Sequence, residues 1–502
     1  MKNLFIFSLA CLLGLLSLST FAQNSVKPNV LVIIVDDLRP EVAAYGDQIA
    51  HTPNIDYLAE TGVLFENAFT AVPVCGASRA ALLSGKKPTT NRFVDYNSRL
   101  DVDFPDAESL PNYFKDNGYY TISNGKVFDA TLDSESAWSE PAWNPEGEWT
   151  SVLFVRGREL PARNARRDDL QRAYLDHQLG IIGPAFERLE AADTDYPDGR
   201  VAEKTIEDLR RLSDLDTPFF LVAGFRKPHL PFTAPERYWS LYDSTDFVLP
   251  STYYETPFGA PSNPIHNSFE LRQSYADIPQ EGLLEETQAL HLIHAYHAAV
   301  SYADAQVGKV LNALTDLGIE DETIVVLLGD HGWSLGEHTM WNKHALFDIA
   351  LRTPLIIRAP NHLSSRNNAV VSLLDLFPTL TELSGLPLPQ NLDGVSLVPI
   401  LSNPQVGVRT SAISRWFDGA SARTDQYRYT DWRDELGQIE ARMLYDLSVD
   451  PDETRNVAEE DRYKDVVFEL STFITSDNSG QPWSPMVRDH VEARKSMQTL
   501  VE

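Results

Sequence analysis

The chain of 502 residues has only two cysteines, Cys11 and Cys75. Cys11 lies in an N-terminal stretch with a basic start, an apolar run and small residues before Ala22, a pattern typical of a secretory signal peptide over residues 1–22. Removal of this peptide would leave Cys75 alone and exclude an intramolecular disulfide, although exported proteins meet an oxidising environment. A single thiol there is either buried and inert or retained for chemistry.

The sequence also lacks a long apolar run and an excess of positive charge. No segment after the signal peptide approaches the roughly 18 apolar residues that a membrane span needs, so we expect no span. We expect instead an exported bacterial protein, periplasmic or secreted. Lys and Arg number 42 against 72 Asp and Glu, a formal net charge of −30, which argues against nucleic acid as a partner. An anionic substrate requires only that positive charge be gathered locally.

Neither repeats nor low-complexity tracts are found. Short apolar runs alternate with helical patterns, which indicates an α/β fold with a mostly parallel central sheet flanked by helices. Continuous Val, Ile, Leu and Phe content predicts strands covered on both faces, at residues 29–35, 119–123, 218–223, 323–328 and 354–358. The clearest helix is predicted over residues 287–317. We interpret its three regularly spaced histidines, at 291, 294 and 297, as a packed or solvated face, because they do not converge on one point.

The length indicates more than one domain, and the pattern changes near residues 386–389 (LPLP). We predict a large domain over residues 23–390 and a smaller sheet-plus-helix subdomain over residues 391–502. The smaller unit is expected to contain strands at 411–416, 427–432 and 441–447 and a helix at 461–475. Segments 130–175 and 233–285, rich in Pro, Trp, Tyr and acidic residues, are interpreted as insertions over one rim of the sheet.

Polar clusters follow four of the predicted strands directly. They are Asp36-Asp37, Gly125-Lys126, residues 226–229 (RKPH) and Gly329-Asp330-His331. Any one cluster alone is typical of a turn, but in open α/β sheets ligands bind beyond the carboxyl ends of the strands. Three aspartates from two strands supply oxygen ligands that suit Ca²⁺ or Mg²⁺ better than zinc, and without a cation they would repel one another. His331 could ligate weakly or orient a carboxylate.

Cys75 precedes a predicted short helix that Gly85 closes. A helix N-terminus attracts an oxyanion, and the guanidinium of Arg79 matches a tetrahedral anion. Lys126, His229 and Lys343 offer further donors. A divalent cation, a nucleophile-type residue and several cations together indicate a site for transfer of a tetrahedral oxyanion.

These residues resemble a known family. Residues 75–79 (CGASR) resemble the sulfatase signature Cys-x-Pro/Ala-Ser-Arg, whose cysteine is converted to formylglycine, and residues 118–128 are similar to the second signature. The stretches FRKPHLPF, LGDHGWSLGEHTMWNKHALFD, SLLDLFPTL and YRYTDW resemble the iduronate-2-sulfatase branch and its bacterial relatives. The similarity runs from about residue 28 to residue 456. It implies a type I sulfatase with an alkaline-phosphatase-like fold.

The resemblance also implies a site. Formylglycine, made from Cys75 by a formylglycine-generating or sulfatase-maturing enzyme, would hold one Ca²⁺ with four further ligands: Asp36, Asp37, Asp330 and His331. The sulfate would be surrounded by Arg79, Lys126, His229 and Lys343. The aldehyde hydrate would attack sulfur to give a sulfo-enzyme intermediate, with His229 as general acid for the leaving alkoxide. The second hydroxyl of the hydrate would then expel sulfate.

One residue departs from the family pattern. After Gly-Lys-Val-Phe, relatives usually have a histidine that is assigned to the last deprotonation, and here the residue is Asp129. Asp129 could take this role, or another histidine such as His344 could replace it.

The resemblance to a uronate sulfatase suggests a sulfated carbohydrate substrate such as ulvan or a glycosaminoglycan, with Trp333 or another rim aromatic stacking on a sugar. Two alternatives to a sulfatase would have a different function. A phosphate or phosphonate ester hydrolase of the same superfamily would be expected to have a second metal-ligand cluster. A non-catalytic relative that binds sulfated glycans would not need the cysteine, the lysines and the aspartates.

Overall fold

A computed structural model of the chain describes residues 27–145, 184–266, 269–275, 277–434 and 436–478. The predicted signal peptide and residues 146–175 of the first predicted insertion lie outside these ranges. In the described ranges, no helix combines the length and the apolar composition needed to cross a membrane.

A seven-stranded sheet forms the centre of the molecule, in the order β3-β5-β1-β7-β8-β2-β9. Its strands are β1 (Asn29–Val35), β2 (Val63–Phe69), β3 (Tyr120–Gly125), β5 (Phe219–Phe225), β7 (Thr323–Gly329), β8 (Leu355–Arg358) and β9 (Ser365–Ser372). The four neighbours β3, β5, β1 and β7 are parallel, whereas β8 is antiparallel to both β7 and β2. The predicted α/β class with a mostly parallel sheet is confirmed, and all five predicted strands are present.

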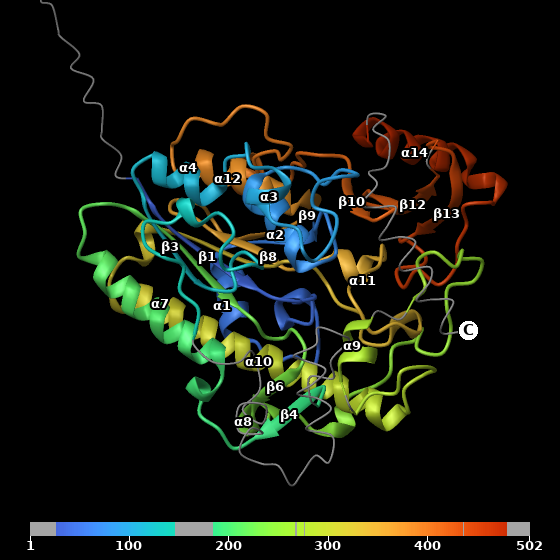
Figure 1. Cartoon of the computed structure of the whole chain (residues 1–502), viewed down its shortest axis with the longest axis horizontal. Helices are drawn as coiled ribbons and strands as arrows, with labels where there is room; N and C mark the ends of the chain where they lie inside the picture. Colours follow the sequence, from blue (N-terminus) through green and yellow to red (C-terminus); the bar gives the residue numbers. More distant parts are fainter. Residues whose placement is uncertain (1–26, 146–183, 267–268, 276, 435, 479–502) are drawn as a thin grey trace, which may run out of the picture.

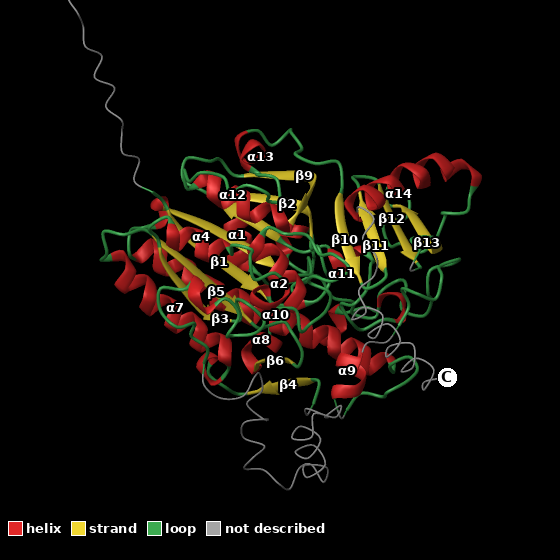
Figure 2. Ribbon diagram, turned by 45° about the horizontal axis from the view of Figure 1, so that its top comes forward, coloured by secondary structure: helices red, strands yellow, loops and turns green. Residues whose placement is uncertain are grey.

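The apolar strands are buried on both faces, as their composition predicts. In β1, Val30, Val32 and Ile34 face one core, and Leu31, Ile33 and Val35 face the other. Figures 1 and 2 show helices on both sides of the sheet. The first core is closed by α2 (Cys75–Ser84), α4 (Leu110–Asp116) and α12 (Leu376–Leu383), and the second by α1 (Pro53–Thr61), α7 (Pro197–Ser213) and α10 (Glu286–Asp316).

The long helix α10 matches its predicted range within one residue at each end. Its histidines pack: His294 and His297 are buried against Tyr242 and Phe247, and His291 stacks on Phe186 with ring centroids 4.6 Å apart. The interpretation of these side chains as a packed or solvated face is therefore confirmed, with His291 as the exposed member.

A separate four-stranded antiparallel sheet follows in the C-terminal part, in the order β10-β11-β12-β13. It comprises β10 (Ala412–Trp416), β11 (Gly419–Arg423), β12 (Tyr427–Arg433) and β13 (Ile439–Asp446), and α14 (Lys464–Asn478) packs on it. The predicted sheet-plus-helix unit is present, while its boundary at residue 390 stays a prediction. The remaining elements are short: β4 (Phe186–Leu189), β6 (Phe232–Pro235), α3 (Leu100–Asp103), α8 (Glu236–Trp239), α9 (Phe269–Ser274), α11 (Asp348–Leu351) and α13 (Val398–Ser402).

The backbones of β5 and of the chain after β3 approach closely at Gly224. The Lys126 N–H donates to the Gly224 carbonyl oxygen at 2.9 Å, and a Cβ at Gly224 would lie 1.9 Å from the Lys126 carbonyl oxygen. A glycine is therefore required for Lys126 to leave the sheet where it does.

We expect Gly224→Ala to lower the free energy of unfolding by about 2 kcal/mol, because the added methyl group must displace backbone in a packed core. Denaturant unfolding measures the change. Gly407→Ala is the control, because Gly407 is exposed and its Cβ would lie 3.5 Å from the nearest atom. Equal stability of the two variants would contradict the close approach.

Candidate active site

The polar clusters meet because the strands that carry them are neighbours in register. Val35 at the end of β1 pairs with Phe225 of β5 and with Gly329 of β7, and Gly125 of β3 pairs with Gly224. The residues that follow each strand therefore emerge at one edge of the sheet, as expected for a parallel α/β sheet.

Helix α2 brings Cys75 to this edge. Cys75 is the first residue of the helix, Val74 before it is extended, and Gly85 ends the helix in the left-handed conformation that glycine favours. The Cys75 Sγ is buried and lies 3.3 Å from His331 Nε2, 3.4 Å from Lys343 Nζ and 3.8 Å from Asp37 Oδ1.

A group of potential metal ligands surrounds this sulfur. One ligand atom each from Asp36, Cys75, Asp330 and His331 lies within 4.8 Å of the others, and Asp37 belongs to an overlapping group with Asp36, Cys75 and His229. The three aspartates are almost fully buried. The structure thus brings together all five residues that the sequence suggested as ligands.

The donor geometry fits a cation. His331 Nδ1 lies 3.0 Å from the Gly332 carbonyl oxygen, which can only accept, so Nε2 is the ring nitrogen that would ligate an ion. Nε2 lies 3.5 Å from Asp37 Oδ1 and 3.6 Å from Asp330 Oδ2. Acceptor atoms that face one another at this spacing repel unless a positive ion lies between them. Carboxylate oxygens are ligands that Ca²⁺ and Mg²⁺ prefer.

Three cations pair with the same aspartates. Arg79 donates from Nε to Asp330 at 2.9 Å and from Nη2 to Asp36 at 2.9 Å. Lys126 Nζ lies 2.6 Å from Asp36, and Lys343 Nζ lies 3.0 and 3.1 Å from the two oxygens of Asp37. The remaining contacts of Arg79, from Nη1, go to the carbonyl oxygens of Lys126 and Val127.

These charges shift the protonation equilibria. Burial alone would raise the pKa of Asp36, but the ammonium of Lys126 and the guanidinium of Arg79 bring it well below its usual value. Burial and the neighbouring Asp36 raise the pKa of the Cys75 thiol well above its usual value. Cys75 is therefore a neutral thiol and not an activated thiolate of the kind that thiol enzymes use.

His229 and Glu270 complete the site from a different direction. His229 follows β5, and its Nε2 lies 3.1 Å from Glu270 Oε1 and 4.0 Å from Asp37 Oδ2. The same Glu270 oxygen lies 3.1 Å from Lys343 Nζ. Glu270 was not predicted. It lies in α9, within a segment whose sequence has no strand or helix periodicity, so no local pattern identifies it.

Three further predicted residues lie around this centre. Asp129 Oδ1 lies 3.0 Å from Lys126 Nζ and is partly exposed. His344 stacks on Trp416 of β10, with ring centroids 4.9 Å apart and planes at 6°. The suggestion that Trp333 stacks on a sugar is wrong, because Trp333 is fully buried and lies beneath Lys343, whose Nζ is 5.3 Å from its ring centroid.

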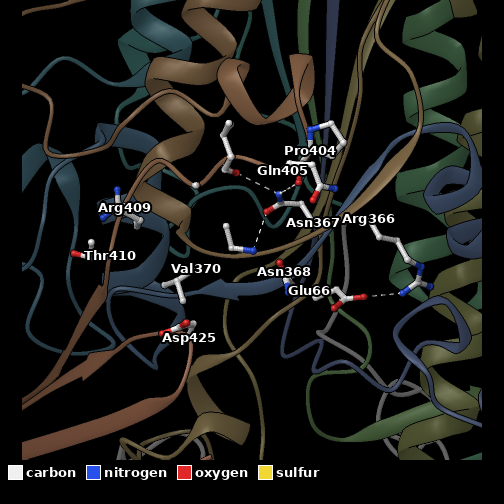
Figure 3. A pocket seen from close by; sticks show the side chains of 13 residues that line it. Glu66, Arg366, Asn367, Asn368, Val370, Pro404, Gln405, Arg409, Thr410 and Asp425 are labelled. Carbon is white, nitrogen blue, oxygen red and sulfur yellow. Dashed lines mark hydrogen bonds and ion pairs between the residues drawn. The ribbon is translucent and has the colours of Figure 1, made fainter. Parts of the chain in front are cut away.

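A separate polar pocket of about 730 Å³ lies between β9 and the segment around residues 404–410 (Figure 3). Its arginines are paired within the protein: Arg366 with Glu66 at 3.1 Å, and Arg409 with Asp375. None of the residues that line it belongs to the cluster around Cys75.

Comparison with protein families matches residues 28–386 to the family described as Sulfatase. The chain belongs to the sulfatase family. It is therefore a sulfuric ester hydrolase. Residues 336–479 match a second family model, described as N-sulphoglucosamine sulphohydrolase, C-terminal. Membership implies a metal site and a formylglycine derived from a cysteine, and the structure gathers a potential metal-binding group around Cys75.

Individual relatives agree with this assignment. The sulfatase is 32% identical to human iduronate 2-sulfatase over 86% of this chain and 90% of the human protein. It is 30% identical to a sulfatase of Formosa agariphila over 90% of this chain and 87% of that protein. The solved structure of BT4656, in complex with its substrate D-glucosamine-2-N,6-O-disulfate, shares the fold, with a TM-score of 0.69 and 20% identity over 90% of this chain and 98% of that one.

Proposed function

We propose that this sulfatase hydrolyses sulfate esters of a sulfated carbohydrate, with a nucleophile made by converting Cys75 to formylglycine. The observation that carries the proposal is the position of the Cys75 sulfur, within 3.8 Å of Asp37, His331 and Lys343. A neutral, buried thiol is a poor nucleophile itself, whereas the hydrated aldehyde made from it would supply a hydroxyl at the same position.

The metal belongs to the same proposal. Asp36, Asp37, Asp330, His331 and residue 75 would hold one Ca²⁺, which would supply positive charge to the oxygens of the sulfate group. Arg79 directs its described contacts to Asp36, Asp330 and backbone carbonyls, so it would orient two of these ligands as well as add charge near the sulfate.

Two lysines would bind the sulfate oxygens. Lys343 Nζ is 3.4 Å from the Cys75 sulfur, and Lys126 Nζ approaches the same centre through Asp36. Both are held by carboxylates, so their ammonium groups are already oriented before charge develops on the sulfuryl oxygens. His229 lies on the other side of Asp37, where it would protonate the leaving alkoxide.

The substrate is proposed to be a uronate-containing polysaccharide or oligosaccharide, such as ulvan or a glycosaminoglycan. The similarity to human iduronate 2-sulfatase supports a uronate, and the aromatic-rich segments of the sequence are consistent with carbohydrate. The same proposal includes export through a signal peptide at residues 1–22, action in the periplasm or medium, and maturation by a formylglycine-generating enzyme. It also includes the division of the mature chain into a catalytic domain at residues 23–390 and a smaller subdomain at residues 391–502.

A phosphate or phosphonate ester substrate is less well supported. Both potential metal-ligand groups found in the described residues contain Asp36 and Cys75, so they form a single cluster with no second one beside it. Phosphate esters carry more charge than sulfate monoesters and would call for additional cations.

Cys75→Ala is expected to lower sulfate release by on the order of 10⁴-fold or more, because the nucleophile is removed while the fold is retained. The measurement uses protein made together with a maturing enzyme and sulfated oligosaccharides from ulvan and from glycosaminoglycans. An unchanged melting temperature of the variant serves as the control. Undiminished hydrolysis by the variant, or faster cleavage of a phosphonate ester by the wild type, would refute the proposal.

Asp129 is proposed as the proton acceptor in the step that releases sulfate. Burial would raise its pKa, but Lys126 lowers it below the usual value, so the group is an ionised carboxylate near neutral pH. We expect Asp129→Ala to lower kcat by on the order of 10²-fold, and Asp129→His to restore part of the rate. Asp106→Ala, at an exposed position, is the matched control. An unchanged kcat in Asp129→Ala would make Asp129 a bystander.

A further inference from the structure

Glu270 links two side chains that the proposed reaction uses but that reach the site from different strands. His229 follows β5 and Lys343 follows β7, and both contact the same oxygen, Glu270 Oε1, at 3.1 Å. The Glu270 side chain is 17% exposed, so these contacts are made largely away from solvent, where an ion pair is screened less.

The surroundings of the His229 ring hold it in one orientation. Nδ1 is 2.6 Å from the Leu230 carbonyl oxygen, and Nε2 is 3.1 Å from Glu270 Oε1. Leu230 and Glu270 thus offer an acceptor to each ring nitrogen. Contacts on both sides fix the orientation of the His229 ring.

Glu270 also fixes the ammonium of Lys343. Lys343 Nζ is shared among Glu270, the two oxygens of Asp37 and the Cys75 sulfur. With acceptors on two sides, the ammonium stays beside residue 75. Burial would raise the pKa of Glu270, but Lys343 and His229 hold it well below its usual value, so the carboxylate is charged in both contacts.

We infer that Glu270 is a positioning residue, which holds the His229 ring and the Lys343 ammonium together beside residue 75. This inference rests on the proposed function. As the S–O bond of the ester breaks, the leaving oxygen keeps the electron pair and takes a proton from the His229 ring, and solvent then returns a proton to the ring. The negative charge of Glu270 favours that return.

This role makes the enzyme suited to poor leaving groups. A sugar alkoxide needs a proton as it departs, whereas an activated phenolate such as 4-nitrophenolate leaves without one. Loss of Glu270 should therefore slow the two classes of ester by different factors. A side chain that merely stabilised the fold would slow both classes alike.

The test compares Glu270→Gln with the wild type on a sulfated oligosaccharide and on 4-nitrophenyl sulfate. We expect kcat for the oligosaccharide to fall on the order of 10²-fold, and kcat for the aryl ester, which loses only the hold on Lys343, to fall by less than about tenfold. The double variant with His229→Gln should lose less activity on the oligosaccharide than the two single losses combined, because part of the effect of Glu270 acts through His229. Glu281→Gln, at an exposed position in the same segment, is the matched control.

Equal losses on both esters, or no loss on either, would overturn the positioning role. Additive losses in the double variant would also overturn it, because they would show that Glu270 acts independently of His229. If the wild type releases sulfate from neither ester, the proposed function fails, and the role of Glu270 fails with it.

Discussion

Three carboxylates buried side by side are the constraint on which the rest of the site depends. Asp36 and Asp37 follow β1 and Asp330 follows β7, and all three are at most 1% exposed. Like charges so close raise the free energy of the folded state unless cations lie between and around them.

Five carboxylates meet at this centre: the three aspartates, Asp129 and Glu270. They face three permanent cations, Arg79, Lys126 and Lys343, so negative charge remains in excess even when His229 is protonated. A divalent ion fits this imbalance.

The fold places these groups through contacts that extend beyond the central sheet. The parallel order β3-β5-β1-β7 puts four strand ends at one edge, and α2 brings Cys75 to them. The C-terminal sheet adds support from another direction: Trp416 of β10 stacks on His344, the residue after Lys343. Asp348 of α11 accepts from Arg423 at 2.9 Å and from Arg428 at 2.6 Å, which ties β11 and β12 to the large unit. The position of Lys343 thus depends on both parts of the chain.

The sequence predicts the parts of this arrangement that local patterns encode. Continuous apolar runs identify β1, β5 and β7 because buried parallel strands need such residues, and a polar cluster follows each of them directly. Strands β2 and β9 were not predicted, because they lie toward the sheet edge and carry polar residues (VLFENAF and SRNNAVVS). Glu270 and the burial of Trp333 depend on how irregular segments pack in three dimensions, which no periodicity records. The resemblance to the sulfatase family does not predict Glu270 either, because Glu270 lies outside the family motifs.

We propose that the buried carboxylates and residue 75 hold one divalent ion. A crystal structure of the matured protein grown with calcium, with anomalous scattering to identify the ion, tests it most directly. We expect a single Ca²⁺ at roughly 2.3–2.6 Å from oxygens of Asp36, Asp37 and Asp330, next to the modified residue 75. A fully active protein without an ion at this position, or with calcium only elsewhere, would contradict it.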